Sequence, residues 1–209
     1  MADNVDDAWN RVESWLRLNA PAVWRRLGPP ATDAELAEVE QVHGVRLPGD
    51  LAAWWQRSNG IIGDPVTIAT IILGTHTPAS THDSIARDVF GMDLTKQQAR
   101  DDADYRSGLE TYRSDSAGWA NDEWVWLNEW ITIGLDSDSL FVDCRSGAHH
   151  GCVMTAFRDG GQIGPRWPSI TAMWTEIADL LESVNARDKP EMIELDDGQE
   201  WWIPSSWWA

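Results

Sequence analysis

Two cysteines and two histidines near the middle of the chain have the side chains that zinc prefers. Cys144, His149, His150 and Cys152 lie within one short stretch, and thiolates and imidazoles are common zinc ligands. Their spacing, with four residues between the first cysteine and the histidine pair, is not a common ligand pattern. A polar turn that carries two histidines between two small strand residues explains the same stretch. We therefore predict no metal site and no cofactor.

Three aspartates could also do chemistry. Asp136 and Asp138 alternate as the first ligands of a calcium loop do, but the central glycine and the later acidic ligand of an EF-hand are absent. Asp143 could act as a general base, yet the sequence places no nucleophile or histidine partner beside it. The chain also lacks a GxSxG elbow, a P-loop, a dinucleotide glycine fingerprint and an HExxH motif. We predict no catalytic residue and no enzyme activity, with an unrecognised hydrolase or metal enzyme as the least favoured alternative.

The charge of the chain favours a basic protein partner. There are 34 acidic and 16 basic residues, for a formal net charge of -18. This field opposes direct binding to a nucleic-acid backbone, whereas it would steer a basic protein toward the chain. Solubility alone is the alternative explanation of the same charge.

Other features of the sequence indicate a cytoplasmic protein. We favour a monomer, with the oligomeric state left open. No apolar run approaches the roughly 18 residues that a membrane helix needs, and the acidic N-terminus has no apolar signal-peptide core. Cys144 and Cys152 do not make a disulfide framework. They could face each other on neighbouring strands, but free thiols are expected in a reducing cytoplasm.

The fifteen tryptophans suggest both a large core and an exposed contact surface. Several lie beside acidic residues, a combination that suits an arginine-rich partner through cation–π and salt contacts. Alternatively, the tail tryptophans pack on the body of the domain or stack on sugars. Trp119 could instead close one end of the core. The candidate partner-binding residues are Trp119, Asp122, Glu123, Asp136, Asp138, Glu194, Asp196, Asp197, Glu200, Trp207 and Trp208.

The elements that must position these residues are clearest between residues 30 and 60. Thr32 and Glu35 can form a capping box that starts a helix, and Gly44 can end it in a left-handed conformation. Pro48 suits the first turn of a second helix, and Asn59-Gly60 stops that helix. Its apolar stripe is Leu51, Trp54 and Trp55.

The rest of the chain predicts an antiparallel meander between helices. Helices are expected at residues 7–19, 22–27 and 94–114 and after Ser169, and a surface loop with one helical turn at residues 75–91. Strands are expected at residues 66–73, 124–127, 130–133, 140–143 and 151–157. Asp196 to Gln199 between two apolar runs predicts a C-terminal hairpin.

The order of these signals resembles the SUKH superfamily. Thr32 to Leu36, Gly44 to Pro48 and Asn59-Gly60 match its N-terminal signature, while Trp130, Asp143 and Gly151 match a second one, so that the resemblance covers about residues 22–184. It implies an α+β domain with a mixed or antiparallel sheet packed against N- and C-terminal helices. We expect that domain at residues 1–189, with residues 190–209 as an appended tryptophan-rich hairpin and tail.

The resemblance also implies function. The superfamily includes bacterial immunity proteins against secreted toxins and a fungal regulator of cell-wall synthesis, and it has no catalytic motif that the chain could share. Our first hypothesis is therefore an immunity protein that binds and blocks one cognate toxin, of a basic, nuclease type. The second is a regulatory scaffold that binds several cellular partners. The resemblance assigns no binding residues.

Overall fold

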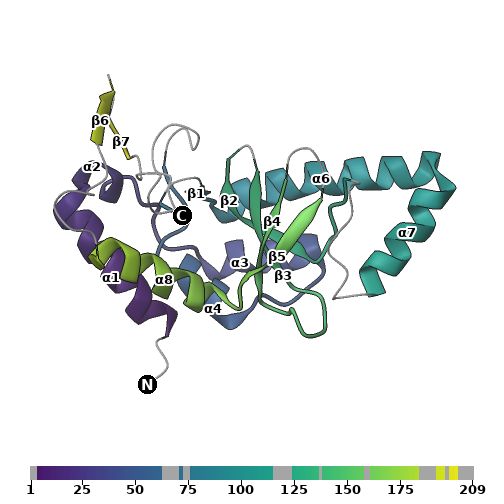
Figure 1. Cartoon of the computed structure of the whole chain (residues 1–209), viewed down its shortest axis with the longest axis horizontal. Coiled ribbons are helices and arrows are strands. Elements are labelled where there is room, and N and C mark those ends of the chain that lie inside the picture. Colours follow the sequence, from purple (N-terminus) through teal and green to yellow (C-terminus); the bar gives the residue numbers. More distant parts are fainter. Residues whose placement is uncertain are drawn as a thin grey trace.

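The computed structural model shows an α+β fold, as predicted (Figure 1). It describes residues 4–62, 71–72, 76–114, 124–136, 138–157, 161–183, 192–195 and 198–201. The helices are α1 (Val5–Asn19), α2 (Pro21–Trp24), α3 (Asp33–His43), α4 (Gly49–Trp55), α6 (Thr81–Asp101), α7 (Ala103–Ser114) and α8 (Ile170–Ser183). None of these helices is both long enough and apolar enough to cross a membrane.

The main sheet has five strands in sequence order, and every neighbouring pair is antiparallel. Its strands are β1 (Thr77–Pro78), β2 (Trp130–Leu135), β3 (Ser139–Asp143), β4 (Val153–Ala156) and β5 (Gln162–Trp167). β2 to β4 are almost wholly buried, because helices cover the sheet and leave its strands little contact with water. Because all four pairings are antiparallel, the sheet is antiparallel rather than mixed.

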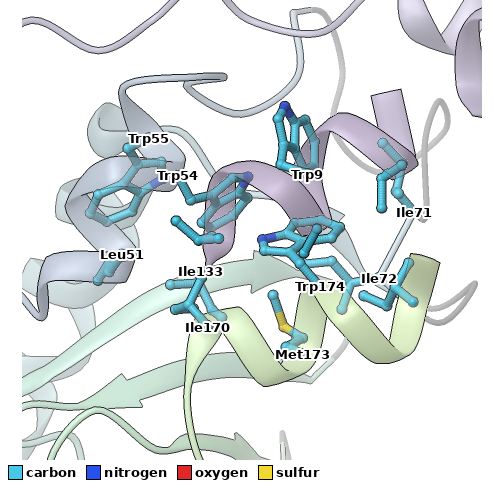
Figure 2. Packing of buried hydrophobic residues seen from close by; sticks show 14 of the residues in the cluster. Trp9, Leu51, Trp54, Trp55, Ile71, Ile72, Ile133, Ile170, Met173 and Trp174 are labelled. Carbon is cyan, nitrogen blue, oxygen red and sulfur yellow. The ribbon is translucent and has the colours of Figure 1, made fainter. Parts of the chain in front are cut away.

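The largest core cluster joins the two ends of the chain. α1 packs along α8, and α4 packs against both (Figure 1). Trp9, Trp54 and Trp174 meet there, with ring centroids 4.6 Å apart for Trp9–Trp174 and 5.0 Å for Trp54–Trp174 (Figure 2). Each is almost fully buried, and burial of a large apolar side chain contributes on the order of 2 to 3 kcal/mol. The predicted role of tryptophan in the core is confirmed for these residues.

Most of the predicted helix signals between residues 30 and 60 are confirmed, but α4 ends at Trp55, so Asn59-Gly60 does not end this helix as predicted. Thr32 and Glu35 form a capping box, in which Glu35 N–H donates to Thr32 Oγ1 at 3.2 Å and Thr32 N–H donates to Glu35 Oε2 at 2.7 Å. Gly44 ends α3 at φ +67°. Gly60 has φ +75°, and a Cβ on it would lie 2.4 Å from the backbone nitrogen of Ser80, so no larger residue fits this close approach. Pro48 is the N-cap of α4, one position before the expected place.

Three predicted elements were wrong or differ. Residues 75–91 are not a surface loop, because Ser80 and Asp83 form a capping box that begins α6 at Thr81. The expected helix at 94–114 is divided at Asp102, the residue between α6 and α7. Residues 124–127 are not a strand, although residues 125–127 are buried. Trp126 N–H donates to Thr95 Oγ1 at 2.8 Å, so this apolar run packs on α6 instead of pairing. Of the expected strand at 66–73, the structure describes residues 71 and 72 alone, and the rest lies outside the described residues.

The predicted C-terminal hairpin is confirmed. β6 (Met192–Leu195) pairs with β7 (Gly198–Trp201) in an antiparallel ladder. Leu195 pairs with Gly198, so two residues join the strands, and Gly198 and Gln199 belong to β7 rather than to the turn. β7 lies beside α2 (Figure 1). The division of the chain at residue 189 stays a prediction.

Candidate functional site

A buried histidine and a buried aspartate face each other between α3 and α6. His43 Nε2 lies 3.3 Å from Asp88 Oδ2, and neither side chain is exposed. His43 Nδ1 lies 2.7 Å from the carbonyl oxygen of Asn128. Because a carbonyl only accepts hydrogen bonds, Nδ1 carries a proton and Nε2 faces the carboxyl group.

Asp88 also holds the sheet. Its Oδ2 accepts from Thr132 N–H at 2.9 Å and from Ser84 Oγ at 3.3 Å, and its Oδ1 accepts from Thr132 Oγ1 at 2.5 Å. Burial raises the pKa of Asp88 to about 7 against these hydrogen bonds, and burial lowers the pKa of His43. Such perturbed groups can mark an active site, but this pair is sealed from solvent. The pair joins α3, α6 and β2. No sequence motif predicts it, because the two residues are 45 positions apart.

Asp143 has a structural partner instead of a catalytic one. Its Oδ1 accepts from the backbone N–H of Arg145 at 3.0 Å, and Arg145 Nη2 donates to Oδ2 at 3.1 Å. Both side chains are buried, and the guanidinium carbon lies 5.7 Å from the centre of the Trp130 ring. This confirms the interpretation of Asp143 as a strand-end residue that binds the following turn.

The cysteine and histidine stretch forms the turn between β3 and β4 in the structure. Cys144 and Cys152 are buried free thiols, and burial raises the pKa of both, so that neither is a thiolate ready for metal or for nucleophilic attack. His150 is exposed, with Nδ1 3.3 Å from the Cys144 carbonyl oxygen. Within the described residues, no group of three or more His, Cys, Asp or Glu side chains is arranged to hold a metal ion.

The candidate partner-binding residues fall into three groups. Asp136 and Asp138 lie at the β2–β3 turn, where Asp136 N–H donates to the Asp138 carbonyl at 3.1 Å. Glu194 and Glu200 lie on β6 and β7, and the register pairs Glu194 with Gln199 and Glu200 with Ile193, so it does not pair the two glutamates. The remaining candidates lie outside the described residues: Trp119, Asp122, Glu123, Asp196, Asp197, Trp207 and Trp208.

Many described acids are engaged inside the fold. Glu40 accepts from the backbone N–H of Leu47 at 2.9 Å, and Asp50 accepts from the backbone N–H of Thr171 at 2.9 Å. Arg11 binds both Asp179 and Glu182 and thereby joins α1 to α8. Capping and bridging use much of the negative charge, so net charge alone does not locate a contact surface.

Three of the five exposed large apolar side chains among the described residues lie on α6, which forms with α7 a helical hairpin, hereafter the arm. It projects beyond the edge of the sheet (Figure 1). On α6, the exposed fractions are 39% for Val89, 59% for Phe90 and 39% for Leu94, and the opposite side of the helix is buried. At helical spacing these three residues share the outward side. Clustered exposed apolar residues with a polar rim are typical of protein-binding surfaces.

Hydrogen bonds fix the turn of the arm, where α6 meets α7, and join α7 to Trp124. Asp102 Oδ1 accepts from the backbone N–H of Asp104 at 2.8 Å and of Tyr105 at 3.0 Å, which caps the start of α7. Tyr105 donates its hydroxyl proton to the Trp124 carbonyl at 2.6 Å. Arg106 Nε donates to the Ala99 carbonyl at 2.7 Å and caps the end of α6. A fixed helix face is a better binding element than a loop, because less order has to be gained on binding.

An arginine and two tryptophans lie where the arm joins the sheet. The guanidinium carbon of Arg87 lies 5.7 Å from the centre of the Trp124 ring and 5.9 Å from that of Trp126. Both Arg87 and Trp124 are half-buried. Trp124 follows the candidate residues Asp122 and Glu123 in the sequence. Arg87 of the chain itself thus already covers this tryptophan.

Comparison with models of protein families identifies a match. The family model described as SMI1 / KNR4 family (SUKH-1) matches residues 30–176, which is more than half of the chain. The match begins before α3 and ends within α8, so it includes the sheet and the arm. None of the curated proteins compared with the chain matches it.

Proposed function

Since this chain belongs to the SMI1/KNR4 family (SUKH-1), we propose that it is a toxin-immunity protein. It binds one cognate toxin, of a basic and nuclease type, and neutralises it as a one-to-one complex. The observation that carries this proposal is the family match, because the superfamily contains immunity proteins. The proposal involves no catalysis, since covering the toxin's active surface is sufficient to block it.

The charge of the chain supports a basic partner. A formal net charge of -18 attracts a cationic protein over distances of about one Debye length, roughly 8 to 10 Å at physiological salt. Nucleases carry basic surfaces where they contact phosphates. Attraction between the two proteins raises the association rate, and this rate falls as salt rises.

We place the apolar part of the contact on the outward side of α6. Val89, Phe90 and Leu94 supply exposed apolar area on a fixed helix, and interfaces depend on a few such anchors surrounded by polar residues. Trp119 and its acidic neighbours follow α7 directly in the sequence and stay candidates for the same contact, as do Asp136 and Asp138.

The experiment that tests the proposal uses the product of the gene beside the one that encodes this chain. Its toxin domain is purified and titrated with the full chain by calorimetry, and its nuclease activity is followed in parallel. A one-to-one complex that abolishes cleavage supports the proposal. Recovery of several unrelated cellular partners, without binding to that toxin, would favour the regulatory scaffold instead.

A further inference from the structure

The groove between α6 and α7 gathers cations in a chain that has few. Lys96 and Arg100 line it from α6, and Arg106 and Arg113 line it from α7. These are four of the chain's 16 basic residues, and Glu110 is the one acid among the lining residues that the structure describes. The groove encloses about 580 Å³, which lies within the range of ligand sites.

Two of these cations have no partner in the described structure. Lys96 lies 3.5 Å from Asp93 on its own helix, and Arg106 binds the last carbonyls of α6. Among the residues that the structure describes, neither the Arg100 nor the Arg113 side chain makes a hydrogen bond or an ion pair. Both side chains are exposed, so their guanidinium groups can reach a ligand in the groove.

The chemistry of the groove fits carboxylates. A guanidinium presents paired N–H donors that match the two oxygens of a carboxylate or a phosphate. Ala99 and Leu109 form an apolar part of the lining, and the arginine stems add to it. A ligand with acidic groups beside aliphatic ones therefore fits both the cationic and the apolar lining residues of the groove.

The surroundings of the groove select a short ligand. Asp101 and Asp104 lie exposed at the turn where the two helices meet, and the whole chain carries a formal charge of -18. A long polyanion such as a nucleic acid would place further phosphates against these acids, at an electrostatic cost. A peptide with a few carboxylates avoids this cost. We propose that the α6–α7 groove binds a short acidic segment of a partner protein.

This site is independent of whether the partner is a toxin. If it is, the acidic surfaces of the chain attract the toxin's basic face, while the groove accepts an acidic segment and fixes the orientation. Complementary charges of both signs give specificity as well as attraction. A test with a synthetic peptide examines the groove without the toxin, so failure of either proposal leaves the other testable.

The probe is a fluorescein-labelled hexapeptide with four glutamates and two leucines, titrated with the full chain at low salt and followed by anisotropy. The expected result is binding that weakens as salt rises. The double variant Arg100→Glu/Arg113→Glu should bind at least about tenfold more weakly, since each arginine supplies a charge-assisted contact. The variant Arg100→Gln/Arg113→Gln should lose most of the affinity without adding negative charge, and circular dichroism checks that both variants are folded.

The control is Arg25→Glu/Arg46→Glu, which makes the same charge change at exposed arginines outside the groove. It should leave peptide affinity within about twofold at physiological salt, where distant exposed charges are screened. Failure of the peptide to bind, or equal losses in the groove and control variants, would overturn the proposal. So would tighter groove-dependent binding of a thymidine hexanucleotide than of the peptide, which would make the groove a nucleic-acid site.

Discussion

His43 Nε2 and Asp88 Oδ2 lie 3.3 Å apart with both side chains fully buried, so a proton on either group lies close to the other. With Nδ1 of His43 bound to a carbonyl, a proton between the two groups resides either on Nε2 or on the carboxyl group. Burial favours the neutral form of both residues, since it raises the pKa of Asp88 to about 7 and lowers that of His43.

The opposite shifts of these two pKa values predict an unusual pH dependence. Asp88, with its pKa raised from 3.8 to about 7, contributes stability that declines as pH rises through that range. His43, with its pKa lowered from 6.5, contributes stability that declines as pH falls below 6.5. Between about pH 4 and 6.5 the two effects oppose each other, because folded and unfolded chains each hold one proton on the pair.

Replacing Asp88 by asparagine should expose the histidine's contribution. In Asp88→Asn, the buried His43 stays neutral while the unfolded chain gains a proton, so stability should fall by up to about 1.4 kcal/mol per pH unit below pH 6.5. Urea unfolding of wild type and variant at several pH values measures the difference, and other titrating groups cancel. Equal slopes for the two proteins would contradict the opposed titrations of His43 and Asp88.

The buried Asp143–Arg145 pair should be costly to break from one side. Asp143→Ala leaves a buried guanidinium without its carboxylate, and such changes cost about 3 to 5 kcal/mol. The double variant Asp143→Asn/Arg145→Met removes both charges and should lose less stability than the single variant. Thermal and urea unfolding give both values. A single variant as stable as the double one would mean that the charge is solvated instead of paired.

Gly91 allows α6 to approach the segment that carries Trp126 closely. A Cβ at this position would lie 2.8 Å from Trp126 Cγ, so Gly91→Ala should lower the free energy of unfolding by about 1 to 2 kcal/mol despite alanine's better helix propensity. Gly108→Ala on α7 is the matched control, because its Cβ would meet nothing within 4 Å. That variant should gain up to about 1 kcal/mol. Similar changes in both variants would contradict the close packing.

The outward side of the arm should contribute to toxin binding but not to folding. Phe90→Ser/Leu94→Ser removes two exposed apolar side chains and should weaken toxin affinity by at least about tenfold, as loss of interface anchors does. Stability should be unchanged or slightly higher. Leu18→Ser, at an 82% exposed position on α1, is the control and should bind as wild type. Unchanged affinity of the arm variant would place the contact elsewhere.

Local signals in the sequence predicted the fold best. The predicted helix ends depend on residues close in sequence: Thr32 and Glu35 begin α3, and Gly44 ends it. Ser169 Oγ accepts from the backbone N–H of Ala172 at 3.0 Å, as a helix cap should. α6 was missed at its start because its buried side carries polar residues, such as Ser84 and Asp88, which leave no apolar periodicity to read.

The candidate site could be predicted only in part. Exposure of Phe90 and the gathering of cations in the groove depend on how α6 and α7 pack, and neither follows from residue types. Asp136 and Asp138 were correctly placed in a turn, since turn chemistry is local. Most of the aromatic and acidic candidates, including Trp119 and Trp207, lie outside the described residues, so their role stays a prediction.

The most direct test of the immunity proposal is calorimetric titration of the neighbouring toxin domain with the full chain at low and at physiological salt, with association rates and nuclease activity measured on the same samples. We predict a one-to-one complex that stops cleavage and whose association rate falls as salt rises. Absence of binding, or a complex that leaves the toxin active, would contradict the proposed function.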